Sequence, residues 1–125
     1  MNALRFIKNI LHKQVNKYKI KTPVYIPVFH SNLLENRVAL ITGSTSGIGK
    51  SISEAFLRSG ATVILTGRDN EKLKLLYDEL TQIINNDKIK IGILDISDIS
   101  NIENQFLSIL NSTKLKIDIF VNNAG

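Results

Sequence analysis

One glycine-rich turn constrains the fold of this 125-residue chain more than any other feature. Glycines stand at positions 43, 47 and 49, after the apolar run 38–41 and before residues 51–57, whose apolar members have helical spacing. Glycine lets the backbone turn tightly and approach a pyrophosphate, and the N–H groups that begin the next helix can hold the phosphates. A strand, a glycine-rich turn and a helix in this order predict a dinucleotide-binding site, with Gly43, Gly47 and Gly49 as its phosphate and close-packing glycines.

Hydroxyl side chains accompany these glycines, and the sequence leaves two roles open for them. Each hydroxyl could bond a phosphate, or it could brace the turn through bonds to the protein backbone. The residues concerned are Thr42, Ser44, Thr45 and Ser46.

Apolar runs and amphipathic patterns alternate along residues 37–125. The runs predict strands at 37–42, 61–66, 89–94 and 117–121, and the patterns predict helices at about 47–59, from about residue 69, and after Asp98. Such alternation with short connections indicates a parallel sheet with right-handed crossovers. We therefore expect an α/β fold, the N-terminal half of a Rossmann-type doubly wound parallel sheet, with strand order 3-2-1-4.

Local signals indicate the ends and the inner faces of the three helices. Gly60 is expected to end the first helix, while Asp69 and Asp98 are placed to cap the second and third. The predicted inner faces are Ile48, Ile52, Ala55 and Phe56 in the first helix, Leu73, Leu76, Leu80 and Ile83 in the second, and Ile102, Phe106, Ile109 and Leu110 in the third.

The net charge of +5 belongs to an N-terminal extension, residues 1–36, which holds six basic side chains against Glu35. Residues 37–125 carry ten basic and ten acidic side chains, and this neutral balance argues against a nucleic-acid binder, which needs a basic face on the folded unit. Residues 2–18 are amphipathic and basic, which is typical of a transit peptide, most simply a mitochondrial one. The alternatives are a plain extension in a cytoplasmic protein, or an arm that binds a membrane surface or nucleic acid. Pro23 and Pro27 then indicate an extended linker.

The composition gives no support for cysteine-based sites or for a membrane span. The chain has no cysteine, which excludes disulfides and cysteine-based metal sites, and we assign no metal site. It contains no run of roughly 18 apolar residues, so we expect no membrane span.

Two motifs resemble the short-chain dehydrogenase/reductase family. The first is Thr-Gly-x3-Gly-Ile-Gly at 42–49, and the second is Asn-Asn-Ala-Gly at 122–125, directly after an apolar strand. Residues 38–125 most resemble 3-oxoacyl-acyl-carrier-protein reductases of that family. The resemblance implies that Asn122 ties the sheet together, while Asp95 and Ile96 contact the adenine. It implies cofactor contacts by Gly43, Ser44, Thr45, Ser46, Gly47, Ile48, Gly49, Asn123, Ala124 and Gly125.

The end of the second strand indicates which nicotinamide cofactor binds. An acidic residue there would bond both ribose hydroxyls of NAD, but this chain has Thr66-Gly67-Arg68. The guanidinium of Arg68 can pair with the 2′-phosphate of NADP. The alternative is an exposed arginine paired with Asp69 or Glu71. Members of the family often have a second basic residue at the position of Ser46, so Arg68 alone must give the NADP preference.

The family's catalytic residues have no counterpart here. The resemblance implies a tyrosine with a lysine four residues later and a serine upstream, but Tyr18, Tyr25 and Tyr77 are followed at that distance by two threonines and a phenylalanine. We therefore expect the N-terminal, cofactor-binding part of an NADPH-dependent reductase of 3-oxoacyl thioesters in fatty acid synthesis. Its partners would be a small-molecule or acyl-carrier-bound carbonyl substrate and further copies of itself. The alternative is a non-catalytic NADP-binding module or truncated remnant.

Overall fold

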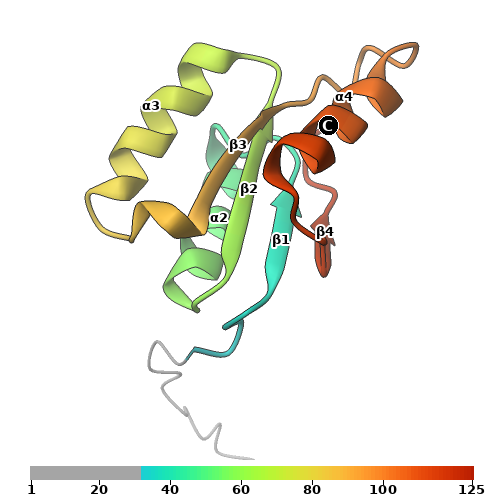
Figure 1. The fold of residues 1–125 in the computed structure, drawn as a ribbon. Coiled ribbons are helices and arrows are strands. Elements are labelled where there is room, and N and C mark those ends of the chain that lie inside the picture. The colour runs from blue at the N-terminus through green and yellow to red at the C-terminus, as the bar shows by residue number, and fades with distance from the viewer. Residues whose placement is uncertain (1–31) are drawn as a thin grey trace, which may run out of the picture.

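The computed structural model describes residues 32–125, in which four strands alternate with three α-helices (Figure 1). The amphipathic segment 2–18 and the linker with Pro23 and Pro27 lie outside the described residues. The elements in chain order are β1 (Val38–Ile41), α2 (Gly47–Arg58), β2 (Thr62–Gly67), α3 (Asn70–Thr81), the 3₁₀ helix η1 (Asn86–Lys88), β3 (Ile89–Ile93), α4 (Ile102–Thr113) and β4 (Ile119–Val121).

The four strands form one parallel sheet in the order β3-β2-β1-β4. Val38 pairs with Thr62 of β2, and Ala39 pairs with Ile119 of β4, so β1 is flanked on both sides. The order reverses at β1, and in open α/β sheets a ligand binds beside such a reversal, at the carboxyl ends of the strands. The predicted fold and strand order are confirmed.

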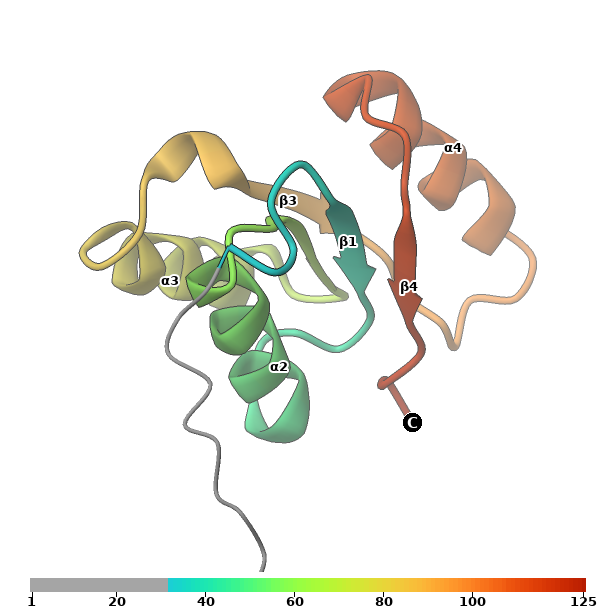
Figure 2. The ribbon, with the colours of Figure 1, turned by 90° about the horizontal axis from the view of Figure 1, so that it is seen from below.

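The helices cover both faces of the sheet, with α2 and α3 on one face and α4 on the other (Figure 2). Side chains alternate along β1 and β2, so Ile41 and Leu65 pack under α2 and α3 while Leu40 and Ile64 pack under α4. All four of these side chains are fully buried. Burial on both faces explains why the central strands are continuous apolar runs.

The buried face of α2 matches the predicted one only in part: Ile52 and Phe56 pack against the core as expected, but Ile48 and Ala55 do not. Gly49, Ser53 and Leu57 are buried, whereas Ile48 is 72% exposed and Ala55 is also exposed. The helix sits close to the glycine turn through Gly49, and this contact sets its rotation. Ser53 tolerates burial because its hydroxyl donates to the Gly49 carbonyl oxygen at 2.7 Å.

The other predicted helix features are correct with two exceptions. Gly60 follows α2 with φ +92°, and Asp69 caps α3 by accepting from the N–H groups of Glu71 and Lys72. Ile83 lies beyond the end of α3 and is half exposed. Asp98 does not cap α4, because the N-cap residue is Asn101, three residues later.

Residues 32–36, which we assigned to the N-terminal extension, contact the folded unit. The N–H of Leu34 donates to the carbonyl oxygen of Ser59 at 2.9 Å, and its side chain packs against the core beneath α2 and α3.

None of the helices in residues 32–125 has the length and apolar character needed to cross a bilayer.

Candidate functional site

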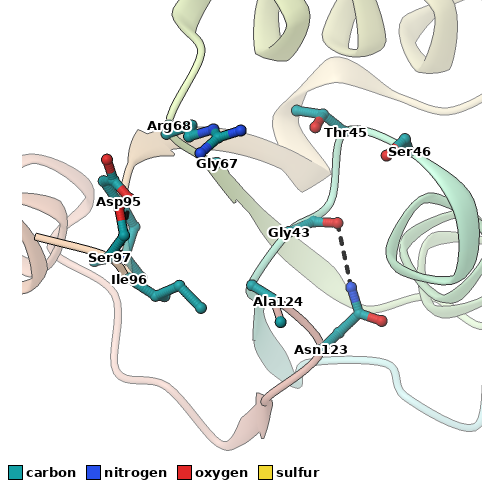
Figure 3. A pocket seen from close by; sticks show the side chains of 12 residues that line it. Gly43, Thr45, Ser46, Gly67, Arg68, Asp95, Ile96, Ser97, Asn123 and Ala124 are labelled. Carbon is teal, nitrogen blue, oxygen red and sulfur yellow. Dashed lines mark hydrogen bonds between the residues drawn. The ribbon is translucent and has the colours of Figure 1, made fainter.

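A cavity of about 510 Å³ lies at the carboxyl ends of the strands, beside the reversal in strand order (Figure 3). The glycine turn and the end of β4 form one side, and the residues that follow β2 and β3 form the other. Its lining consists of Gly43, Thr45, Ser46, Gly67, Arg68, Leu94, Asp95, Ile96, Ser97, Asn123, Ala124 and Gly125.

Two glycines allow the turn after β1 to pass close to α2. Gly43 has φ +64°, in the left-handed region that side chains disfavour. At Gly49, a Cβ atom would collide with the carbonyl oxygen of Gly43 and lie 2.5 Å from the side-chain nitrogen of Asn123. A side chain at position 49 would therefore push the start of α2 away from the cavity.

The hydroxyls of the turn divide between the two roles that the sequence left open. Ser44 is fully buried, and its hydroxyl donates to the Ile41 carbonyl oxygen at 2.6 Å and accepts from the Thr66 N–H at 3.1 Å. Ser44 thus braces the turn and does not line the cavity, contrary to its expected place among the cofactor contacts. Thr45 and Ser46 do line the cavity.

The N-terminus of α2 opens at the cavity without a side-chain cap. Ser46 is the N-cap residue, but its hydroxyl makes no capping bond, and the first turn has no acidic side chain. By contrast, α3 is capped by the carboxylate of Asp69. Uncapped N–H groups and the positive end of the helix dipole attract an anion, so this end of α2 suits a phosphate.

The end of β4 is bonded to the glycine turn through Asn123. Its side-chain amide donates to the carbonyl oxygens of Thr42 at 3.0 Å and Gly43 at 3.2 Å. The Thr42 hydroxyl accepts from the N–H groups of Asn123 and Ala124, both at 2.9 Å. Asn122, expected to tie the sheet, has an exposed side chain. The tie is made by Asn123, because successive side chains point to opposite faces of the sheet, and Asn122 lies on the α4 face with Phe120.

Arg68 is exposed at the rim of the cavity and forms no ion pair within residues 32–125. Within residues 32–125, the ion pairs join Arg37 to Asp118, Lys50 to Glu79, Arg58 to Glu54 and Lys74 to Glu71. Asp69 is engaged in capping α3. The alternative pairing of Arg68 with Asp69 or Glu71 is therefore absent from the described structure, and the guanidinium is available to a bound anion.

Asp95 lies across the cavity from Gly43 and presents an ionised carboxylate (Figure 3). The carboxylate accepts from the hydroxyl of Ser97 at 2.6 Å and from the Ser97 N–H at 3.0 Å. These bonds, with the positive charge of Arg68, outweigh desolvation and lower the pKa of Asp95 below its ordinary value. Its neighbour Ile96 is 37% exposed, so an apolar surface lies beside a hydrogen-bond acceptor.

Comparison with known proteins shows the family. The family model described as short chain dehydrogenase matches residues 37–125. The chain belongs to the short-chain dehydrogenase family.

Two curated relatives and one solved structure illustrate the similarity of this chain to known proteins. NADP-dependent 3-hydroxy acid dehydrogenase YdfG of Escherichia coli K12 is 41% identical over 88 residues, covering 70% of this chain and 33% of the relative. Dehydrogenase/reductase SDR family member 7C of Bos taurus is 33% identical over 101 residues, covering 78% of this chain and 32% of the relative. The N-domain of bacterial malonyl-CoA reductase, solved with NADP, aligns with TM-score 0.67 and 30% identity, covering 76% of this chain and 17% of that one.

The chain spans about a third of the length of the curated relatives that it matches. The structure brings together, around one cavity, most of the residues that the sequence singled out. Of the residues expected to contact the cofactor, those outside the cavity lining are Ser44, Gly47, Ile48 and Gly49. Gly47 and Gly49 still shape the start of α2, whereas the side chain of Ile48 points to solvent.

Three residues that line the cavity were not expected from the sequence: Gly67, Leu94 and Ser97. A Cβ on Gly67 would lie 3.2 Å from the Thr45 methyl group, so this position adjoins the turn after β1. Ser97 could have been found, because a serine two residues after an aspartate often closes a local hydrogen-bonded turn.

Across residues 32–125 no three histidine, aspartate or glutamate side chains gather as a metal site would require.

Proposed function

We propose that this chain binds NADPH and supplies the cofactor-binding part of a short-chain reductase. The main support for this proposal is that two groups that attract anions border the same cavity. The uncapped N-terminus of α2 and the exposed guanidinium of Arg68 both border it, and Arg68 forms no ion pair within residues 32–125. The relatives named for NADP and solved with NADP give independent support.

The residues around the cavity fit the parts of NADPH by their chemistry. The N–H groups at the start of α2 would hold the pyrophosphate, with Thr45 and Ser46 as additional hydroxyl donors. Arg68 would pair with the 2′-phosphate, because its planar guanidinium matches a phosphate and no acidic residue ends β2. The carboxylate of Asp95 would accept from the adenine amino group, and Ile96 would cover the adenine ring.

When bound, the cofactor supplies a hydride from its nicotinamide ring. The segment Asn123–Gly125 lies at the far side of the cavity from Asp95 and would border the ribose and nicotinamide (Figure 3). Hydrogen bonds from Asn123 to the glycine turn hold this segment in place. This chain's contribution is thus to bind and orient the cofactor.

For the substrate we propose a 3-oxoacyl thioester, reduced to the 3-hydroxyacyl product in fatty acid synthesis. The support is the resemblance of residues 38–125 to 3-oxoacyl-acyl-carrier-protein reductases. One relative is named for 3-hydroxy acids, and these compounds carry their hydroxyl group on the same carbon as the 3-oxo group of the proposed substrate. The test is NADPH consumption by the full-length protein with a 3-oxoacyl thioester and with the free 3-oxo acid. Faster turnover of the free acid would contradict the thioester assignment.

A second candidate is an NADP-binding module without turnover. Its basis is that the described residues would bind a cofactor without a tyrosine at the cavity, since Tyr77 packs against the core beneath α2 and α3. Calorimetric titration of NADPH, followed by assays with carbonyl substrates, separates the candidates. Binding with turnover supports the reductase, binding without turnover supports the module, and absence of binding overturns both.

We also propose a mitochondrial location and a homo-oligomeric full-length protein. The location rests on the basic amphipathic pattern of residues 2–18, with a cytoplasmic location as the alternative. A fluorescent fusion of residues 1–36 should colocalise with mitochondria, and diffuse cytoplasmic signal would contradict the assignment. Sedimentation of the full-length protein tests the oligomer, since a monomer at micromolar concentration would contradict it.

A further inference from the structure

The loop between β3 and α4 is anchored by one side chain of α4, Gln105. Leu94 still belongs to the sheet by hydrogen bonding, since its N–H donates to the Gly67 carbonyl oxygen at 3.0 Å. The next residue, Asp95, has left the strand, and its N–H donates to the side-chain oxygen Oε1 of Gln105 at 2.7 Å. Gln105 thus takes over the support of the backbone at the point where β2 no longer provides it.

The same amide also reaches the far end of this loop. Nε2 of Gln105 lies 3.5 Å from the carboxylate oxygen Oδ2 of Asp98, as donor to acceptor. The N–H of Asp98 in turn donates to the carbonyl oxygen of Asp95 at 3.2 Å. Gln105 is partly buried in the first turns of α4, an element that is itself packed on the sheet through Ile109. One side chain of α4 therefore contacts both ends of the loop 95–98.

The cavity depends on how this loop is oriented. Asp95, Ile96 and Ser97 all line it, and the carboxylate of Asp95 is fixed relative to its own backbone by the bonds from Ser97. A rotation of the Asp95 backbone would therefore carry the carboxylate with it. The bond from the Asp95 N–H to Gln105 opposes that rotation. Without this acceptor the N–H would be unpaired, which is unfavourable, and the backbone would rotate until the N–H had another acceptor.

We propose that Gln105 is a positioning residue that aims the carboxylate of Asp95 at the base of the bound cofactor and so sets base selectivity. This inference rests on the proposed NADPH function of the cavity. Gln105 is absent from the cavity lining, so it acts through Asp95 and not by contact with the cofactor. Its effect is confined to ligands whose base offers an amino group to the carboxylate.

The test compares NADPH with nicotinamide hypoxanthine dinucleotide phosphate, whose base carries an oxygen in place of the adenine amino group. Dissociation constants for both reduced dinucleotides are measured by calorimetry on the full-length protein. Gln105→Met keeps the length of the side chain and removes the acceptor. It should weaken NADPH binding about fivefold, the loss expected for one hydrogen bond, and change binding of the hypoxanthine analogue little.

Two further variants separate positioning from general damage to α4. The selectivity ratio is the dissociation constant of the hypoxanthine analogue divided by that of NADPH. Asn104→Met removes a neighbouring exposed amide that makes no bond to Asp95, and it should leave this ratio unchanged. In an Asp95→Ala background the carboxylate is gone, so Gln105→Met should no longer alter the ratio. The ratio of the two dissociation constants does not depend on the folded fraction, so partial unfolding of a variant does not obscure the result.

Each outcome decides a different claim. The positioning role is supported if Gln105→Met lowers the selectivity ratio, if Asn104→Met leaves it unchanged, and if Gln105→Met no longer changes it in the Asp95→Ala background. An unchanged ratio in Gln105→Met, with the parent protein selective for NADPH, overturns the positioning role alone. A parent protein that binds both dinucleotides equally overturns the role of Asp95 and with it that of Gln105. A parent protein that binds neither overturns the proposed function itself.

Discussion

The side-chain amide of Asn123 donates to the carbonyl oxygen of Gly43 at 3.2 Å, which links the end of β4 to the glycine turn 80 residues earlier. A second bond from the same nitrogen reaches the Thr42 carbonyl oxygen at 3.0 Å. The two motifs that carry the family resemblance are therefore one hydrogen-bonded unit. This unit forms one side of the cavity, opposite the residues that follow β2 and β3.

Asn123→Ala should destabilise the protein by about 1–3 kcal/mol, because the partly buried carbonyl oxygens of Thr42 and Gly43 lose their donor. The free energy of unfolding in urea measures this change. Asn122→Ala is the matched control, since the exposed side chain of Asn122 should contribute within about 0.5 kcal/mol. Equal effects of the two substitutions would contradict the assignment of the tie to Asn123.

Arg68→Ala should weaken NADPH binding about 10- to 100-fold and change NADH binding little, because only NADPH has the 2′-phosphate that the guanidinium would pair with. Calorimetric titration with both dinucleotides measures the difference. Arg58→Ala serves as the control for loss of an arginine, since Arg58 is paired with Glu54 on α2 and lies outside the cavity lining. If Arg68→Ala weakened both dinucleotides equally, the NADP preference would have to be abandoned.

Gly49→Ala should destabilise the protein more than Gly47→Ala does. Alanine gains about 1 kcal/mol over glycine in a helix interior, but at position 49 its Cβ would strike the Gly43 carbonyl oxygen. At position 47 a Cβ meets no atom within 4 Å, so only the positive φ of +54° disfavours it, by about 1–2 kcal/mol. Urea unfolding and NADPH titration of both variants test this order, and a neutral Gly49→Ala would disprove the close contact.

The lowered pKa of Asp95 predicts how stability depends on pH. Since the pKa in the folded state is below 3.8, the group stabilises the fold above that pH, and the contribution is lost as pH falls below 3.8 and through the folded pKa. Ser97→Ala removes the largest cause of the shift, so the variant should lose less stability than the parent over this acidic range. Unfolding free energies from pH 5 to 2 measure the slopes, and identical slopes would show that Ser97 does not set the pKa.

The architecture could be predicted because its signals are local. The apolar runs in β1 to β4, the left-handed glycine after β1 and the capping carboxylate of Asp69 act within a few residues of themselves. Short connections between such elements leave few topologies, so the strand order followed. The capping of α4 was mispredicted, because Asp98 and Asn101 are both acceptable N-cap residues and only the position of α4 on the sheet selects between them.

The sequence by itself determined the strands, the helices, the sheet order and the residue types that meet at the carboxyl ends of the strands. Only the tertiary structure decided that Asn123 rather than Asn122 ties the sheet, that Ser44 braces the turn, and that Gln105 supports Asp95. The physical reason is the range of the interactions. Periodicity and capping depend on neighbours along the chain, whereas these hydrogen bonds depend on which atoms the packing of α2 and α4 against the sheet brings within about 3 Å.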